Sequence, residues 1–131
     1  MPEWTKTQVT NKTSPRSVAD TVSRLTGILT DKGLRLFAVI DQRQAAIDAG
    51  LDLRETTLVI FGSPAGGTPV MDAVPLAALD LPLKILVWAD GSRTNVTYYS
   101  PAAIAARYEL TAELAARLAG IDPLTDALIG D

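Results

Sequence analysis

Apolar and polar positions follow a helical period in the first third of the chain. Four apolar side chains recur at intervals of three or four residues: Val18, Val22, Leu25 and Leu29. This is the spacing of one face of an amphipathic helix. Ser17 and Asp20 form a capping box at its start, and Gly33 can adopt the left-handed conformation that ends a helix. The pattern therefore predicts a helix that begins after Ser17 and stops at Gly33.

Five other segments have the short apolar or alternating pattern of strands. We expect strands at residues 7–13, 34–40, 56–61, 84–88 and 94–99. The segment 34–40 reads LRLFAVI, which is nearly continuous apolar sequence, so we expect it to be largely buried. Asp90-Gly91 lies between the last two segments, and this dipeptide is a strong hairpin signal because glycine tolerates positive φ.

Capping residues predict further, shorter helices. We expect them at residues 42–49 after Asp41, from Pro69, after Ser100-Pro101 and from Thr111 to Gly120, with only a last turn after Asp122-Pro123. This order of elements is typical of an α+β fold with a mostly antiparallel sheet and helices packed on one face. The sequence has no internal repeat and no linker-like segment. We therefore expect a single domain over residues 1–131, with a core at about 14–119 and a frayed segment at 1–5.

Charge and composition argue against several classes of function. The net charge is −3 and the basic residues are scattered singly, so the basic patch of a nucleic-acid or anionic-membrane binder is missing. The hydrophobic fraction is 47%, as in ordinary globular domains, and no uncharged stretch is long enough to cross a bilayer. The first residues lack the apolar run of a signal peptide. We expect a soluble, cytoplasmic protein.

The chain contains neither cysteine nor histidine. It therefore has no disulfide, no thiolate nucleophile, no imidazole ligand and no side chain that ordinarily titrates near neutral pH. This absence removes most common catalytic devices, and we predict no catalytic residue, no cofactor and no metal site. An oxygen-only magnesium site stays open as an alternative, because carboxylates can come from anywhere in the chain.

The stretch LVIFGSPAGGTPVMD, residues 58–72, resembles a phosphate-binding loop. Gly62 and Gly67 have the spacing of such a loop, but Thr68 and Pro69 follow where a lysine and a hydroxyl residue are required. We therefore predict a strand-to-helix turn, in which the glycine pair 66–67 supplies unusual φ, Thr68 caps the helix and Pro69 is its first residue. In an intermediate alternative, amides at the helix start bind one small anion or a ligand carbonyl.

An ordered set of short motifs resembles the bacterial and archaeal family catalogued as domain of unknown function 302. The matching segments are Val39-Ile40-Asp41, Ala45-Ala46, Gly50-Leu51, Leu58 to Pro64, Gly67-Thr68-Pro69 with Met71, Asp80 to Lys84, Val87-Trp88 and Asp90-Gly91. The resemblance covers about Ser17 to Leu118. It implies a β-α-β4-α fold similar to that of the TATA-box-binding protein, a homodimer and no established activity, and fold similarity alone does not imply DNA binding.

Two positions depart from that family's pattern. Members often have Asp-His where this chain has Asp41-Gln42, and Phe-Gly-Asn-Pro where this chain has Ser63 before the proline. Gln42 can form hydrogen bonds but cannot titrate. Any metal, haem or proton-transfer role of that histidine would therefore be lost here.

The candidate ligand-binding residues are those expected around the glycine-rich stretch: Asp41, Gln42, Gly62, Ser63, Gly66, Gly67, Thr68 and Lys84. Asp41 either caps a helix or presents a carboxylate that faces the glycines across the sheet. Lys84 either extends to water or contacts a ligand.

We infer a non-enzymatic, dimeric module that binds a small molecule, an anionic ligand or another protein chain, and neither nucleic acid nor membrane. Two alternatives are a small enzyme or accessory subunit that uses carboxylates, Ser63 and Lys84, and a purely structural dimerisation domain. Ser63 precedes a proline, and the chain offers no histidine to activate its hydroxyl, which argues against the enzyme.

Overall fold

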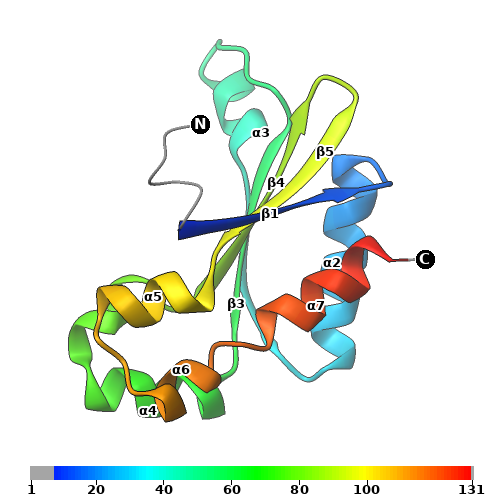
Figure 1. Ribbon diagram of the computed structural model, residues 1–131. Coiled ribbons are helices and arrows are strands. Elements are labelled where there is room, and N and C mark those ends of the chain that lie inside the picture. Colours follow the sequence, from blue (N-terminus) through cyan, green and yellow to red (C-terminus); the bar gives the residue numbers. More distant parts are fainter. Residues whose placement is uncertain (1–7, 131) are drawn as a thin grey trace.

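A computed structural model describes residues 8–130, and these form an α+β fold around one five-stranded sheet (Figure 1). The sheet has the order β1-β5-β4-β3-β2, and every neighbouring pair is antiparallel. Its strands are β1 (Val9–Ser14), β2 (Arg35–Asp41), β3 (Thr56–Gly62), β4 (Leu83–Asp90) and β5 (Arg93–Tyr99). The predicted fold class is confirmed. The frayed segment predicted at residues 1–5 lies outside the described residues.

Within residues 8–130, six α-helices and one short 3-10 helix connect or follow the strands. They are α2 (Val18–Asp31), α3 (Gln42–Asp48), α4 (Pro64–Ala73), η1 (Pro75–Leu79), α5 (Pro101–Arg107), α6 (Ala112–Ala116) and α7 (Ile121–Ile129). Several caps are as predicted: the side chains of Ser17, Asp41 and Ser100 accept hydrogen bonds from backbone amides in the first turns of α2, α3 and α5. Gly33, Gly50 and Gly91 adopt positive φ, as their turns require.

The main hydrophobic core lies between α2, α7 and one face of the sheet (Figure 1). Its members include Leu25, Leu29, Val59, Ile85, Val87, Val96, Leu124 and Leu128, all without exposed surface or nearly so. The last turn predicted near the C-terminus is instead the nine-residue helix α7. Pro123 is tolerated there because it lies in the first turn, where a backbone N–H has no partner within the helix.

The prediction that residues 34–40 are largely buried is wrong. β2 is one of the two edge strands of the sheet, and Leu36, Phe37, Val39 and Ile40 are 37% to 47% exposed. A register irregularity lies between Leu36 and Ala38 in its pairing with β3. The apolar composition of the segment therefore does not place it in the centre of the sheet.

The predicted start of the helix after the glycine-rich stretch is also wrong. α4 begins at Pro64, directly after β3, and Ser63 caps it by accepting a hydrogen bond from the Gly66 amide. The glycine pair and Thr68 lie inside the helix, and neither glycine has positive φ. Pro69 stands within α4 rather than at its first position. Ser63-Pro64 and Thr68-Pro69 are the same kind of start signal, and the helix begins at the first of them.

A second, smaller hydrophobic cluster lies beyond the end of the sheet. It consists of Val70, Ala77, Ile104 and Leu118, from α4, η1, α5 and the segment after α6. Asp80, which follows η1, accepts hydrogen bonds from Arg107 at 2.7 Å and Tyr108 at 2.6 Å. These contacts connect α5 to the segment that leads into β4.

Candidate functional site

A cavity of about 650 Å³ lies between the two hydrophobic clusters, where β3 ends and α4 begins. In Figure 1 this end of β3 lies between α4 and α6 on one side and α2 and α7 on the other. Nineteen residues line the cavity: Lys32, Leu34, Phe37, Phe61, Gly62, Ser63, Pro64, Gly66, Gly67, Met71, Leu81, Pro82, Leu83, Arg117, Leu118, Gly120, Ile121, Pro123 and Leu124. We call it the glycine-lined cavity.

The wall of this cavity is mostly apolar. Phe61, Met71, Leu83 and Leu118 supply aromatic, thioether and branched side chains from four parts of the chain. The polar side chains are those of Ser63, Lys32 and Arg117, and none of the lining residues described is acidic. An apolar concave site with a few polar groups is the usual form of a small-molecule site.

The glycines shape the cavity and do not form a phosphate loop. The amides of Gly66 and Gly67 donate to the Ser63 carbonyl at 3.0 and 2.8 Å, as in a helix start. A phosphate would therefore compete with bonds that α4 already makes. A Cβ at position 66 would lie 3.5 Å from the Arg117 carbonyl oxygen, which is an ordinary van der Waals contact, so α4 packs directly against the segment after α6 at this point.

Four of the predicted site residues line the glycine-lined cavity: Gly62, Ser63, Gly66 and Gly67. Asp41 and Gln42 do not, because Asp41 pairs with Thr57 whereas Gly62 pairs with Arg35 at the other end of β2. At a rise of about 3.4 Å per residue, the two ends of this pairing are about 17 Å apart. The expectation that Asp41 faces the glycines is wrong. Its side chain caps α3 by accepting a hydrogen bond from the Gln44 amide at 2.9 Å.

Thr68 and Lys84 also lie outside the cavity. Thr68 is exposed on α4. Lys84 alternates along β4 with Leu83 and Ile85, which face the helices, so its side chain projects from the opposite face of the sheet. Its charge contributes, after Tyr108 and Arg107, to the lowered pKa of Asp80.

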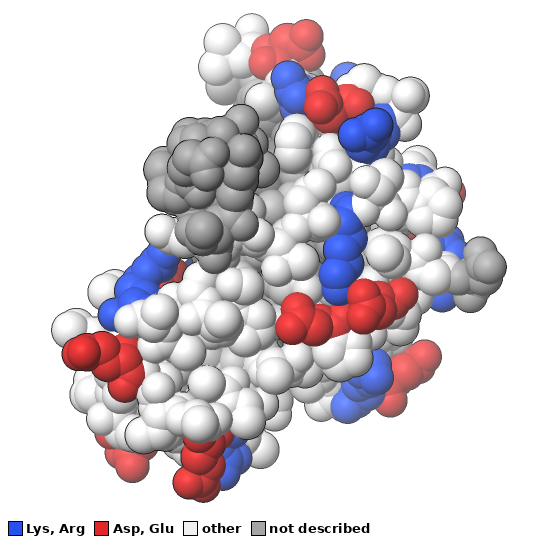
Figure 2. All heavy atoms as spheres, viewed as in Figure 1, with Lys and Arg blue, Asp and Glu red and all other residues white. Residues whose placement is uncertain are grey.

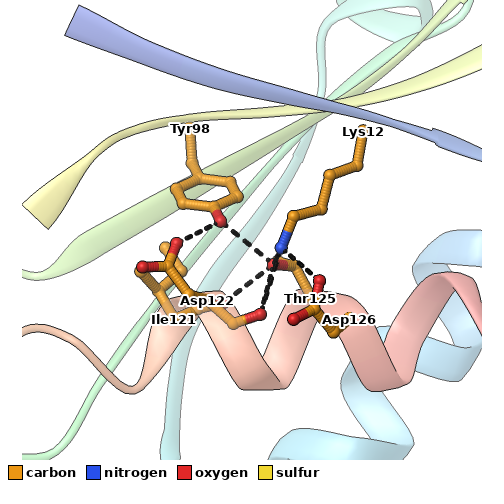
Figure 3. Close-up of polar contacts among 6 residues, drawn as sticks. All are labelled: Lys12, Tyr98, Ile121, Asp122, Thr125 and Asp126. Atoms are coloured by element: carbon orange, nitrogen blue, oxygen red, sulfur yellow. Dashed lines mark hydrogen bonds and ion pairs between the residues drawn. The ribbon is translucent and has the colours of Figure 1, made fainter.

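A polar network that the sequence analysis missed attaches α7 to the sheet (Figure 3). The Tyr98 hydroxyl donates to Asp122 at 2.5 Å and accepts from the Thr125 hydroxyl at 3.2 Å. Lys12 donates to Thr125 at 2.6 Å and forms an ion pair with Asp126 at 2.8 Å. Since Ile121 and Leu124 of the same helix line the cavity, this network holds one cavity wall against β1 and β5.

Two pKa values in the network are raised. Burial is the largest effect on the pKa of Tyr98 and raises it, and the bond to Asp122 raises it further. Burial alone would lower the pKa of Lys12, but the bonds to Asp126 and Tyr98 raise it on balance. Both effects favour the protonated hydroxyl and the protonated ammonium at neutral pH. The network therefore has the properties of a structural attachment.

Another depression of the described surface has a different character. A second depression of about 500 Å³ is lined by charged residues of both signs, among them Arg43, Arg54 and Glu55. Figure 2 shows acidic and basic side chains interspersed over one face, without a field of a single sign. Within residues 8–130 no group of three or more carboxylates could hold a metal ion. No helix in that range is long and apolar enough to cross a membrane.

The sequence analysis also missed the cations and the far wall of the cavity. Lys32 and Arg117 follow the ends of α2 and α6, and nothing in their local sequence indicates that they meet at one cavity. α7 could have been found, because Ile121, Leu124 and Leu128 follow one another at helical spacing. The Asp122-Pro123 dipeptide instead indicated only a single turn at this point.

Comparisons with known proteins extend over most of the chain. The model of the family described as "Domain of unknown function DUF302" matches residues 10–128. The crystal structure of an uncharacterized conserved protein DUF302 from Bacillus stearothermophilus superposes with a TM-score of 0.78, covering 92% of this chain and 94% of that chain. At 17% sequence identity, that likeness shows the shared fold.

The curated relatives are longer proteins. The protein named fluoride-specific ion channel FluC 1 of Brucella suis is 39% identical over 98 residues, which are 74% of this chain and 39% of its own length. The protein named fluoride-specific ion channel FluC 2 of Brucella melitensis has the same identity, over 36% of its own length. The chain thus spans less than half the length of the curated relatives it matches.

Proposed function

The chain belongs to the DUF302 family, a domain family of unknown function, and we propose that it is a non-enzymatic module that binds a small, mainly apolar molecule. The binding site is the glycine-lined cavity. The observation that carries this proposal is the size of the cavity together with its apolar wall. Its volume of about 650 Å³ is within the range of sites that enclose a small ligand, roughly 300–1,000 Å³.

The chemistry of the lining favours binding over catalysis. The lining residues described include no acidic side chain, and the whole chain has no histidine or cysteine. The Ser63 hydroxyl accepts a hydrogen bond from the Gly66 amide at 3.2 Å, and among residues 8–130 no carboxylate or histidine lines the cavity to activate it as a nucleophile. The cavity therefore offers shape and apolar surface, and no acid–base pair for a reaction.

A neutral fluorescent probe tests the proposal. We expect N-phenylnaphthylamine, which brightens in apolar surroundings, to bind the purified protein with a single stoichiometric site. Gly67→Leu places a branched side chain beside Met71, toward which a Cβ at this position points. This change should weaken probe binding at least about tenfold, equivalent to about 1.4 kcal/mol.

Gly27→Leu is the matched control. Gly27 also lies within a helix, α2, and a Cβ there has no atom within 4 Å. Both substitutions raise helix propensity, so both variants should fold, which circular dichroism will verify. Equal probe binding by the wild type and the Gly67→Leu variant would refute the cavity as the binding site.

The Brucella fluoride channels give this binding role a context. An ion channel needs segments that cross the membrane, whereas no helix within residues 8–130 of this chain is suited to do so. We propose that the part of those channels resembling this chain, which is 36–39% of their length, lies outside the pore. There, as in this chain, it would serve as an accessory binding module.

We also propose that the protein is a homodimer joined through β2. This edge strand leaves large apolar side chains on both of its faces exposed to water, and an uncovered apolar edge invites pairing with another strand. Two copies of β2 paired antiparallel would continue the sheet across a two-fold axis and cover these side chains. Sedimentation velocity over a range of protein concentrations tests this; a monomer at every concentration would contradict it.

A further inference from the structure

The charged residues that line the glycine-lined cavity are all of one sign. Two residues with cationic side chains, Lys32 and Arg117, line it, and no acidic residue among those described does, although the whole chain has a net charge of −3. Electrostatic complementarity therefore favours an anionic group at this site. The excess of cations is local and cannot be a consequence of the overall composition.

Neither cation has a partner in the part of the chain that the structure describes. Arg107, Lys12 and Arg16, by contrast, bind carboxylates or backbone carbonyls at 2.7 to 2.9 Å. Lys32 and Arg117 form no ion pair and no side-chain hydrogen bond among residues 8–130. They are thus available to a ligand without the loss of an existing contact.

The remainder of the wall excludes a highly charged ligand. Phe61, Met71, Leu83 and Leu118 offer apolar surface and no hydrogen-bond donor from their side chains. The amides of Gly66 and Gly67 are bonded within α4. A polyphosphate would leave most of its oxygens without a donor here, at a substantial desolvation cost. One acidic group attached to an apolar body matches both parts of the cavity.

We propose that the ligand of this cavity is an apolar monocarboxylate. Its carboxylate binds Arg117 and Lys32 at the exposed rim, and its hydrocarbon part lies against the apolar wall. An arginine guanidinium pairs with a carboxylate through two parallel hydrogen bonds, and the flexible ammonium of Lys32 adds a second positive charge. This assignment of ligand class rests on the proposed binding function.

A helix-dipole role for the two cations is the competing explanation. Lys32 is the C-cap residue of α2 and Arg117 is the C-cap residue of α6, where positive charges stabilise a helix. α6 has only five residues, so its dipole is small. A dipole role predicts that replacing Lys32 or Arg117 lowers stability and leaves the choice of ligand unchanged.

The test compares octanoate with octanol, which differ only in the head group. Each is titrated at pH 8 against protein loaded with N-phenylnaphthylamine, and displacement gives its affinity. We expect octanoate to bind at least about tenfold more tightly than octanol. Arg117→Gln and Lys32→Gln should each weaken octanoate binding far more than the binding of octanol or the neutral probe, and so remove most of this preference.

Arg93→Gln is the control, because it removes one positive charge from an exposed residue at the start of β5, outside the cavity. It should retain the preference for octanoate. Equal displacement by octanoate and octanol in the wild type would overturn the carboxylate assignment and leave the binding function standing. If neither compound nor the probe binds, both proposals fail. A preference that survives in both cavity variants would also overturn the assignment.

Discussion

The two edges of the sheet differ in how they meet water. β1 is a polar edge in which Lys12 points inward and joins the network around Tyr98 and Thr125. β2 is an apolar edge whose large side chains are exposed. A charged side chain that points inward protects a sheet edge against pairing with another chain, whereas exposed apolar side chains favour such pairing.

The difference divides the molecule into a closed side and an open side. On the closed side, α2 and α7 cover the sheet and the polar network secures them. On the open side, the large apolar side chains of β2 are exposed, and the glycine-lined cavity lies beyond the end of this strand, with Phe37 in its wall. Stability should therefore depend on the closed side, and binding on the open side.

The largest expected effect is a loss of stability on the closed side. Leu128 of α7 has no exposed surface, so Leu128→Ala removes buried contacts and leaves a cavity. We expect the free energy of unfolding in urea to fall by about 3 kcal/mol. Leu51→Ala on the open side, where Leu51 is 68% exposed, should change it by about 0.5 kcal/mol or less. Equal losses would contradict the division into two sides.

The next effect concerns the polar network. Tyr98→Phe removes a nearly buried hydroxyl that donates to Asp122 and accepts from Thr125, and should lower the free energy of unfolding by about 1–2 kcal/mol. Tyr99→Phe is the control, because Tyr99 lies on the same strand with its side chain substantially exposed. A Tyr98→Phe variant as stable as the wild type would show that packing alone holds α7.

The same network predicts a loss of stability at alkaline pH. The pKa values of Tyr98 and Lys12 are raised in the folded state, so folding favours their protonated forms. This contribution is complete below their unfolded values of about 10 and is lost as pH rises through the folded values. Urea midpoints measured from pH 8 to pH 11 should fall, and fall less in Tyr98→Phe.

A smaller effect is expected from Asp80, which joins α5 to the segment before β4. Burial alone would raise the pKa of Asp80, but the hydrogen bonds from Tyr108 and Arg107 lower it overall. Its contribution is therefore present above the unfolded value of about 3.9 and is lost as pH falls through the folded value. Solvent screening of the partly exposed Arg107 limits this contribution to about 1 kcal/mol.

Asp80→Asn should flatten the loss of stability between pH 5 and pH 3, measured as urea midpoints, roughly the range in which carboxylates of this kind take up protons. Asp72→Asn replaces an exposed carboxylate on α4 and is the control. Its urea midpoint should fall over the same pH range as that of the wild type does. If the urea midpoints of both variants fell equally with decreasing pH, the assigned role of Asp80 would be contradicted.

The smallest effect on stability comes from the β2 edge. Val39→Lys places a charge on an exposed position and should change the unfolding free energy of the monomer by about 0.5 kcal/mol or less. It should nevertheless abolish the proposed dimer in sedimentation, because two ammonium groups would meet at the paired strands. Thr13→Lys on β1 should leave association unchanged. A dimer that survives Val39→Lys would exclude pairing through β2.

Half of the predicted site residues line the cavity, and these are close together in the sequence. Gly62, Ser63, Gly66 and Gly67 are near one another in the sequence and so remain together in the fold. Asp41 and Lys84 belong to other strands, so their distance from these residues depends on how the strands pair. Strand direction and side-chain alternation, which depend on pairing, separate them.

The amino-acid sequence by itself determined the elements whose signals are local. α2 follows from its cap and its apolar period, α3 from Asp41, and the β4–β5 hairpin from Asp90-Gly91. Each of these depends on neighbours within a few residues, and hydrogen bonds inside one turn are sufficient to select it.

Only the tertiary structure decided which apolar residues are buried and where the cavity lies. A strand of apolar residues has the same local pattern in the centre of a sheet as at its edge, and strand order alone placed β2 at the edge. The wall of the glycine-lined cavity combines residues from Lys32 to Leu124. Burial depends on the packing of such distant segments, and no short stretch of sequence contains that information.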